Sequence, residues 1–330
     1  MKKVYLRSRG GGKQGWGNIY RLITIYELIK KKYDCLFIFE GNQEVANFVK
    51  EKKIKYLRLK ENITISEEER IIEKLEKADL SIIEMLDCSY SRQKIYKKKS
   101  NKLIVFDDIL KKRYCADQVI SAQYKSKPKN IKNLRSGYEF YPLRKEFDNY
   151  INKKKYIKKK IEKVLICLGG SSYNLGNEKM FNFFKNKNYK TTIIKGDEQK
   201  KLNFKTDLKN TNILFLNKSK NLAKLIYESD IVIAGGGYIK IETAFLQTPM
   251  LVLPVQRHQL ELVKDFKKYC SVPFINYSSR LNNRIIELFF NKYNYKYRYQ
   301  MNKTLSNKFR NNIFKKKILS LITNQVGNKK

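Results

Sequence analysis

The sequence predicts an α/β protein made of two doubly wound domains. Short apolar runs alternate with longer helical patterns in both halves of the chain, and a lysine-dense stretch separates the halves. Glycine clusters follow expected strands in each half. Alternation of this kind favours βαβ units and parallel sheets. With 330 residues, 42% of them hydrophobic, the chain is long enough for two separate cores.

The first half is expected to form one parallel sheet. We predict strands at residues 4–8, 35–40, 55–59, 80–85, 102–106 and 118–121, and helices at residues 19–32, 42–52 and 66–77. The strand at 118–121 is expected to be the last of this sheet. The lysine-dense residues 152–163 show little apolar periodicity, which is typical of a linker. We therefore place the domain boundary near Asn149, with domains at 1–149 and 150–330.

The second half repeats the alternation. Strands are expected at residues 163–167, 190–194, 212–215, 231–234 and 250–254, and a basic, tyrosine-rich helical tail follows from Arg280. In open α/β sheets, ligands bind beyond the carboxyl ends of the strands. We therefore expect two Rossmann-like domains facing a central cleft, with glycine clusters lining its walls.

The charge balance is strongly basic, with 71 Lys and Arg against 31 Asp and Glu and a net charge of +40. A positive field of this size attracts phosphate-bearing partners. The excess is mostly lysine and accompanies many Ile, Asn and Tyr residues, a mixture that codon bias toward A and T produces. We favour a surface of solvated lysines and expect no nucleic-acid partner. A peripheral contact with a membrane stays open, and the sequence does not constrain the oligomeric state.

The five cysteines are scattered, and no C-x-x-C pair or nearby histidine accompanies them. This spacing indicates neither a zinc site nor a disulfide framework, and it favours a reduced, cytoplasmic setting. The sequence shows no secretory leader and no apolar run long enough to span a membrane. We expect no metal and no cofactor.

The first glycine cluster follows the first strand and leads into a long helix. Glycines let backbone approach a ligand closely, and a helix start offers N–H groups to a phosphate or a sugar oxygen. The cluster matches neither the P-loop nor the G-x-G-x-x-G fingerprint. Its candidate substrate-binding residues are Arg7, Gly11, Gly12, Gly15, Gly17 and Arg21.

Two further clusters stand in the second half. CLGGSSYN at 167–174 offers backbone amides and hydroxyls after a strand, an arrangement that can bind an anion. The passage from residue 234 to residue 261 offers a glycine turn, a carboxylate for ribose hydroxyls and the only histidine of the chain. Together these clusters contribute the candidates Gly169, Gly170, Ser171, Gly235, Gly236, Gly237, Tyr238, Glu242, His258 and Gln259.

The order of these motifs resembles a known family. FDD at 106–108, CADQVISAQY at 115–124, GYEFYPLRKEF at 137–147, LGGSSYN at 168–174 and AGGGYIKIETAFLQTPMLVLPVQRHQ at 234–259 stand in the same order after an N-terminal glycine-rich loop. This order is similar to that of the UDP-sugar hydrolases of the pseudaminic-acid pathway and the SpsG-like proteins of spore-coat polysaccharide synthesis. The resemblance covers roughly residues 3–266.

The resemblance implies the GT-B fold, with a C-terminal domain like that of glycosyltransferase family 28. It implies that the C-terminal domain holds a UDP-sugar through Gly235, Gly236, Gly237, Glu242 and Gln259. The N-terminal domain would supply the side on which water or an acceptor binds. The implied reaction is hydrolysis at C1 of a UDP-2,4-diacetamido-2,4,6-trideoxyhexose-type substrate, in the synthesis of surface polysaccharide or nonulosonic acid.

The chain departs from the hydrolases at the residue that activates water. Their N-terminal loop reads R-S-D and then G-x-G-H, whereas this chain has Arg9 and Asn18 at those positions. Asn18 can orient water but cannot remove its proton, because an amide has no useful basicity near neutral pH. A second motif of the family, D-H-Y, is represented by LDCSY at 86–90, which keeps Asp87 and lacks the histidine.

Three functions remain open on these residues. The first is a UDP-sugar hydrolase with an altered catalytic group drawn from Asn18, Asp87 and His258. The second is a glycosyltransferase in which Asp87, Asp107, Asp108 or His258 is the base, although an Asp after a strand more often caps a helix. The third is a catalytically weakened module that binds a nucleotide-sugar and acts through partners.

Overall fold

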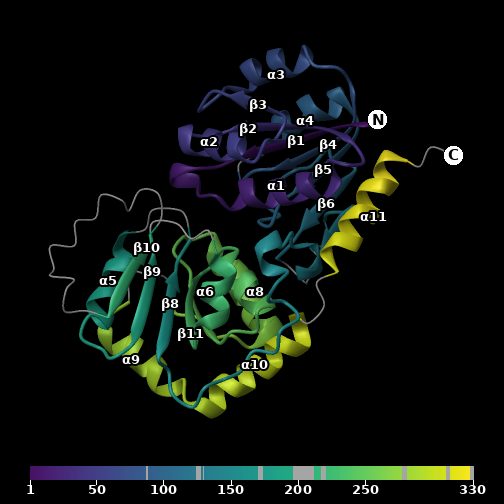
Figure 1. Ribbon diagram of the computed structural model, residues 1–330. Coiled ribbons are helices and arrows are strands. Elements are labelled where there is room, and N and C mark those ends of the chain that lie inside the picture. The colour runs from purple at the N-terminus through teal and green to yellow at the C-terminus, as the bar shows by residue number, and fades with distance from the viewer. Residues whose placement is uncertain are drawn as a thin grey trace. The chain divides into compact units, whose positions relative to one another are not determined.

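The chain forms two compact units, and the first is discontinuous in sequence. The computed structural model describes residues 1–86, 88–123, 128, 130–169, 174–195, 212–216, 221–276, 281–309 and 313–327. Unit 1 comprises Met1–Arg144 and Ile313–Lys330, and unit 2 comprises Lys145–Asn312 (Figure 1). The division thus falls before Lys145, and the last helix belongs to unit 1, whereas the sequence placed it in the second domain.

Unit 1 contains a parallel sheet whose strands follow the order β3-β2-β1-β4-β5-β6-β7. The central strands are buried on both faces, which explains their near-continuous apolar runs. The last strand, β7, was not expected from the sequence. The bounds are β1 Lys3–Arg9, β2 Asp34–Glu40, β3 Tyr56–Leu59, β4 Ala78–Glu84, β5 Ser100–Phe106, β6 Gln118–Ser121 and β7 Leu134–Ser136.

Three of the helices of unit 1 begin at side-chain caps encoded in the sequence. Asn42 accepts a hydrogen bond from the Val45 N–H at 3.2 Å, and Thr64 and Glu67 form a reciprocal capping box. The Ser89 hydroxyl accepts from the Arg92 N–H at 3.2 Å. The bounds are α1 Gly17–Ile29, α2 Gln43–Glu51, α3 Ile65–Glu73, α4 Tyr90–Lys99 and α11 Phe314–Val326, with the short 3₁₀ turns η1 Gly12–Gln14 and η2 Tyr138–Phe140.

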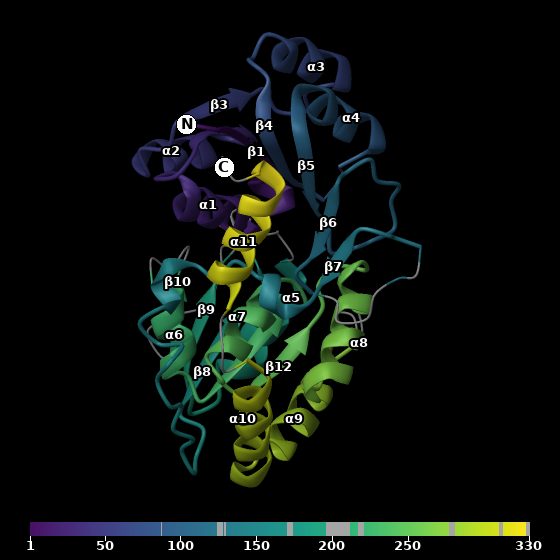
Figure 2. The ribbon, with the colours of Figure 1, turned by 90° about the vertical axis from the view of Figure 1, so that its right-hand side faces the viewer.

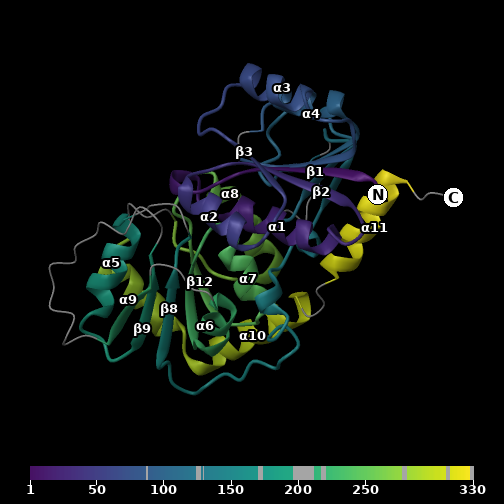
Figure 3. The ribbon, with the colours of Figure 1, turned by 45° about the horizontal axis from the view of Figure 1, so that its top comes forward.

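The helices of unit 1 cover both faces of its sheet. Figure 3 shows α3 and α4 on one face and α1 and α11 on the other. The core under α3 and α4 includes Tyr5, Ile38, Ile83 and Val105 from the strands. On the other face, α11 packs beside α1 although some 285 residues separate them in the chain (Figure 2). The C-terminal helix is therefore a structural part of the N-terminal unit.

Unit 2 contains a second parallel sheet, in the order β10-β9-β8-β11-β12. The five strands of this sheet agree with the ranges expected from the sequence to within one residue at each end. The bounds are β8 Lys163–Cys167, β9 Lys190–Ile194, β10 Ile213–Leu216, β11 Ile231–Gly235, β12 Met250–Leu253, η3 Lys145–Phe147, α5 Asn174–Phe184, α6 Leu222–Glu228, α7 Ile239–Phe245, α8 Gln259–Cys270, α9 Asn283–Lys292 and α10 Tyr295–Phe309.

Helix α10 holds the lysine-dense segment, residues 152–163, by hydrogen bonds to its backbone. Arg298 is 1% exposed and donates hydrogen bonds to the carbonyls of Lys158 and Lys159, at 3.0 and 2.9 Å. The Tyr293 hydroxyl, just before the helix, donates to the Met250 carbonyl of β12 at 2.7 Å. The tail expected from Arg280 onward therefore packs mainly on unit 2. Among the described residues, no helix is long and apolar enough to cross a bilayer.

Candidate functional site

The sheet of unit 2 has one topological switch point, between the adjacent strands β8 and β11. From β8 the chain adds β9 and β10 on one side, and it then returns to add β11 and β12 on the other. In doubly wound sheets the crevice beyond the carboxyl ends at such a point is where ligands bind. The loops after β8, β11 and β12 therefore mark the candidate site of unit 2.

These three loops pack directly against one another. A Cβ placed on Gly235 would lie 2.1 Å from the Leu168 carbonyl oxygen, so the end of β11 touches the loop after β8. A Cβ on Gly236 would lie 2.9 Å from both Cβ and Oε1 of Gln259. The structure thus brings the predicted residues Gly235, Gly236 and Gln259 together, and only glycine fits at the first two positions.

Gln259 also orders the loop after β12. It is 7% exposed, and its Oε1 accepts a hydrogen bond from the Val255 N–H at 2.9 Å. The remaining amide nitrogen lies 3.7 Å from the Cβ position of Gly237. Gln259 therefore connects the glycine turn to the start of α8.

A buried lysine lies beneath this glycine turn. Lys240 is 0% exposed, and its Nζ donates to the carbonyls of Gly236 at 2.7 Å and Gly237 at 2.9 Å. The sequence analysis did not select this residue. Its position four residues after Gly236, at the start of a helix, is the signal that could have found it, since a lysine there can reach back over one turn.

Tyr238 and Glu242 flank Lys240 on the same short helix. Tyr238 is the N-cap residue of α7 and is half-buried, and Glu242 is 6% exposed within the first turn. The Glu242 N–H donates to the Tyr238 carbonyl at 3.1 Å. The two residues thus belong to the same turn as the three glycines, as the sequence predicted.

His258 lies at the start of α8, next to Gln259. It is the N-cap residue of that helix, but its imidazole makes no capping hydrogen bond. Burial lowers the pKa of His258, and the nearby Lys240 charge lowers it further. The imidazole is therefore neutral near pH 7, the state in which it can accept a proton.

The loop after β8 is described only up to Gly169. That glycine has φ +108°, and no atom of the described residues lies within 4 Å of its Cβ position, so a side chain would be strained rather than blocked by them. Gly170 and Ser171 lie outside the described residues, as does the catalytic candidate Asp87 of unit 1.

Unit 1 has its own switch point between β1 and β4, and the first glycine cluster follows β1 there. Gly11, Gly12 and Gly15 have φ of +93°, +51° and +71°, a region that favours glycine. The Gly11 N–H donates to the Gly15 carbonyl at 2.8 Å, which closes the loop, and α1 begins at Gly17. The glycines therefore build a tight loop at the carboxyl edge of the sheet.

Asn18 lies in the first turn of α1, against the end of β1. Its Nδ2 is 3.5 Å from the Arg9 carbonyl. Arg9 in turn pairs with Glu40 at 3.0 Å, at the end of β2. The two positions of the N-terminal loop at which the chain differs from the hydrolases are thus neighbours at the switch point of unit 1.

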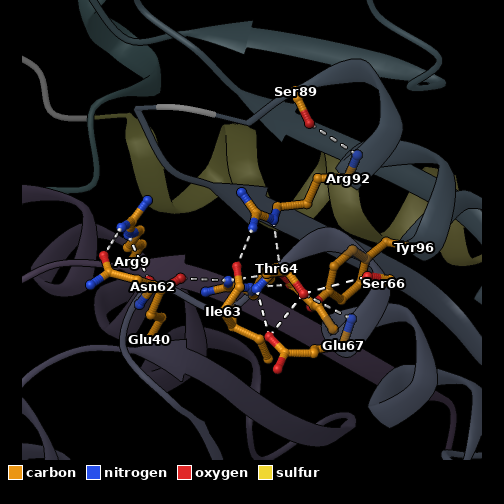
Figure 4. Close-up of polar contacts among 12 residues, drawn as sticks. Arg9, Glu40, Asn62, Ile63, Thr64, Ser66, Glu67, Ser89, Arg92 and Tyr96 are labelled. Carbon is orange, nitrogen blue, oxygen red and sulfur yellow. Dashed lines mark hydrogen bonds and ion pairs between the residues drawn. The ribbon is translucent and has the colours of Figure 1, made fainter.

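Arg7 is a buried structural residue, although the sequence suggested it as a substrate ligand. Its side chain is 0% exposed and pairs with Glu68 of α3 at 2.6 Å and with Glu40 at 3.2 Å. Glu68 also accepts from Arg92 at 2.7 Å and from the Tyr96 hydroxyl at 2.7 Å. Figure 4 shows this group of polar contacts, with Glu40, Arg92 and Tyr96 among its labelled members. Strand β1 alternates faces, which points Arg7 into the core beneath α3 and α4.

Arg21 is likewise buried, on the opposite face of the sheet. Its side chain is 2% exposed and pairs with Glu84 at 2.6 Å and Asp108 at 2.7 Å. Burial opposes ionisation of Asp108, but the Arg21 charge holds the pKa of that carboxyl below its usual value. This placement does not favour substrate contact by Arg21, because both carboxylates hold the guanidinium inside the unit.

The two aspartates of the FDD motif accept hydrogen bonds from backbone N–H groups of unit 1. Asp107 Oδ1 accepts from the Ile109 N–H at 2.8 Å, and Asp108 Oδ1 accepts from the Ala122 N–H at 2.7 Å. The Tyr114 hydroxyl donates to the second oxygen of Asp107 at 2.8 Å. Within the described part of the chain, no group of three or more His, Cys, Asp and Glu side chains is arranged to hold a metal.

Solved structures show which fold this arrangement represents. MurG from Acinetobacter baumannii superposes with a TM-score of 0.69 at 13% identity, covering 98% of this chain and 100% of that one. A UDP-glucosyltransferase from Polygonum tinctorium gives a TM-score of 0.67 at 10% identity, covering 99% of both chains. The chain has the GT-B fold. UDP-GlcNAc 2-epimerase from Neisseria meningitidis, bound to UDP-GlcNAc, gives 0.62 at 13% identity and covers 98% of this chain and 100% of its own.

The other comparisons leave the finer assignment open. No protein-family model matches the chain, and no curated protein matches it. The resemblance to the pseudaminic-acid hydrolases and SpsG-like proteins therefore stays a prediction. The GT-B fold that the resemblance implied is confirmed.

Proposed function

We propose that this chain is an enzyme that binds a nucleoside-diphosphate sugar at the carboxyl edge of unit 2 and acts at the anomeric carbon of the sugar. The observation that carries the proposal is the packing of three loops at the β8/β11 switch point, with glycine obligatory at Gly235 and Gly236. Support comes from the similar structures, since one is a UDP-glucosyltransferase and another is bound to UDP-GlcNAc.

In the proposed complex the glycine turn faces the diphosphate. Backbone that lacks side chains lets phosphate oxygens approach N–H groups closely. Glu242 and Gln259, on the flanking helices, are the groups proposed to accept and donate hydrogen bonds at the nucleoside. No metal is required for this mode of binding if N–H dipoles and a nearby cation stabilise the leaving diphosphate.

Among the possible reactions, we favour glycosyl transfer. An acceptor hydroxyl attacks C1, the bond between C1 and the β-phosphate oxygen breaks, and the diphosphate leaves with the electron pair. A base takes the acceptor proton, and His258 is proposed for this role because its imidazole is neutral near pH 7. Hydrolysis, in which water replaces the acceptor, is the second candidate, favoured by the motif order of the sequence.

The deciding experiment measures UDP release from a panel of UDP-sugars, with and without acceptors, and calorimetric binding of UDP. Release that needs an acceptor supports transfer, whereas release in buffer alone supports hydrolysis. Binding without release in every mixture supports a binding module that has lost its chemistry. Absence of UDP binding would contradict the nucleotide-sugar proposal as a whole.

His258→Gln tests the proposed base. We expect turnover to fall about 100-fold or more, since a general base usually contributes ~10²–10⁴ to the rate. The affinity for UDP should change by less than about twofold, because the variant keeps the backbone of α8 intact. Unchanged turnover would exclude His258 as the base and would leave the aspartates of unit 1 as the candidate bases.

A further inference from the structure

Lys240 is the buried cation closest in sequence to the glycine turn. Its side chain is fully enclosed, and its ammonium donates to the carbonyls of two consecutive residues, Gly236 and Gly237. The Phe266 ring centroid lies 5.7 Å from the same nitrogen. Because burying an ammonium is costly, a lysine is rarely enclosed unless its charge and donors are used.

These two hydrogen bonds fix the orientation of two peptide planes. In a trans peptide, the C=O of one residue and the N–H of the next point in opposite directions. No peptide bond in the described residues is cis. The carbonyls of Gly236 and Gly237 face the Lys240 ammonium, so the N–H groups of Gly237 and Tyr238 face away from it.

The same ammonium places a positive charge behind the turn. His258, at the start of α8, is near enough for that charge to lower its pKa, in addition to the effect of burial. The turn thus combines oriented N–H groups on one side with a fixed cation on the other. Both features attract an anion to the face opposite the lysine.

We propose that Lys240 is a positioning residue for the diphosphate of the ligand: it holds the glycine turn with its N–H groups toward the phosphates, and its charge strengthens their binding. This inference rests on the proposed function, since it concerns the same site. A purely structural lysine would stabilise the turn without distinguishing a diphosphate from an uncharged nucleoside.

The test compares UDP with uridine on Lys240→Met, which keeps the length of the side chain and removes its charge and donors. We expect UDP affinity, measured by calorimetry on the full chain, to fall about tenfold, which corresponds to ~1.4 kcal/mol. Uridine affinity should stay within about twofold. Lys240→Gln, which keeps a donor but not the charge, should also weaken UDP and spare uridine.

Lys155→Met is the matched control. Lys155 is also a buried lysine of unit 2 and donates to two carbonyls, those of Tyr227 and Ser229, but these precede β11 instead of following it. At the opposite end of the strand, the loss of this lysine should leave the ratio of UDP to uridine affinity unchanged. An equal loss of both ligands in Lys240→Met, or no loss of either, would overturn the inference and leave the proposed function standing.

A second measurement uses the wild-type chain and does not depend on the folding of a variant. His258 is the only histidine, so its ring protons give one identifiable titration by NMR. We expect UDP to raise the pKa of His258, because a diphosphate at the turn offsets the lysine charge, and we expect uridine to leave it unchanged. UDP binding without this shift would place the diphosphate elsewhere and refute the inference, whereas a failure to bind UDP at all would refute the proposed function first.

Discussion

The three consecutive glycines at the end of β11 differ in the room that their neighbours leave for a side chain. A Cβ on Gly235 would lie 2.1 Å from the Leu168 carbonyl oxygen, whereas the nearest atom to a Cβ on Gly237 is 3.7 Å away. We expect Gly235→Ala to lower the free energy of unfolding by about 1–3 kcal/mol, since backbone must move to admit the methyl group.

Gly237→Ala is the control at the same turn. We expect its free energy of unfolding to stay within about 0.5 kcal/mol of the wild-type value, because its methyl group meets only ordinary contacts. Urea titrations of both variants measure the difference. Equal effects of the two substitutions would show that the close packing of β11 on the loop after β8 is not what requires glycine.

The free energy of unfolding of unit 2 should rise with pH in mildly alkaline solution because of Lys155. Burial lowers the pKa of its ammonium to about 8, against 10.5 for an ordinary lysine. Between these values the unfolded chain binds one more proton than the folded chain, so stability rises as pH increases from about 8 to about 10.5. The gain is on the order of 1–3 kcal/mol.

Lys155→Met removes this titrating group, so its stability should lack that rise when denaturant unfolding is measured across the same pH range. Lys154→Met, at the exposed neighbouring position, should keep it. Identical pH profiles for the two variants would refute the shifted pKa. Comparison of variants is needed here because many other lysines and tyrosines titrate in this range.

Glu68 joins three elements of unit 1. From α3 it accepts hydrogen bonds from Arg7 of β1 and from Arg92 and Tyr96 of α4, and it is fully buried. Removing one partner of a buried ionic group leaves an uncompensated charge. We expect Glu68→Gln to lower the free energy of unfolding by about 3 kcal/mol or more.

Glu69→Gln, on the same helix, provides the comparison. Glu69 pairs with Lys98 at 3.2 Å, and both side chains are partly exposed. Ion pairs of this kind contribute ~0–1 kcal/mol, so unfolding in urea should change little. A small effect of Glu68→Gln would mean that the arginines find other carboxylates, with Glu40 the nearest to Arg7.

Elements with strong periodicity were predicted correctly from the sequence, and the elements that were missed have physical reasons. The strands β1, β4, β5, β8, β11 and β12 are apolar runs bounded by polar residues. Helix α4 was not predicted because its sequence, YSRQKIYKKK, shows almost no amphipathic pattern. Strand β7 has three residues, too few for a pattern.

The candidate site was predictable where backbone chemistry defines it. Glycine turns after strands are local signals, so Gly235, Gly236 and Gln259 could be selected as candidates from the sequence, and the structure brings them close together. The burial of Arg7 and Arg21 was not predicted because it depends on carboxylates 33 or more residues away, such as Glu40 and Asp108. Lys240 was not selected because its partners are backbone carbonyls, and its spacing of four residues from Gly236 was the only sign of them in the sequence.

At the scale of the molecule, unit 1 depends on the last helix of the chain. On α11, Phe314, Ile318, Leu321 and Ile322 are buried whereas Lys315 and Lys316 are exposed, and the helix packs on α1 and β4. The residue just before β1 also meets the end of α11, since the Lys2 ammonium donates to the Val326 carbonyl at 2.5 Å and the Gly327 carbonyl at 2.7 Å. Loss of a buried side chain from α11 should therefore destabilise the N-terminal unit.

Leu321→Ala tests this dependence. Trp16 is the only tryptophan and lies in unit 1, so its fluorescence reports the unfolding of that unit. We expect the free energy of this transition to fall by about 2–4 kcal/mol, as for other buried leucines. Ser320→Ala, at an exposed position of the same helix, should have little effect. An unchanged tryptophan transition in Leu321→Ala would contradict the assignment of α11 to unit 1.

The discontinuity of unit 1 has a consequence for the newly made protein. A ribosome makes Met1–Arg144 before unit 2, yet unit 1 also needs the segment that begins at Ile313, which is made only after unit 2. Unit 2, encoded in one stretch, has all its residues before then. Domains usually fold in the order of their synthesis. In this chain unit 2 can be complete while unit 1 still lacks α11. A truncated product that stops before Ile313 would therefore expose the face of unit 1 that α11 covers to chaperones and proteases.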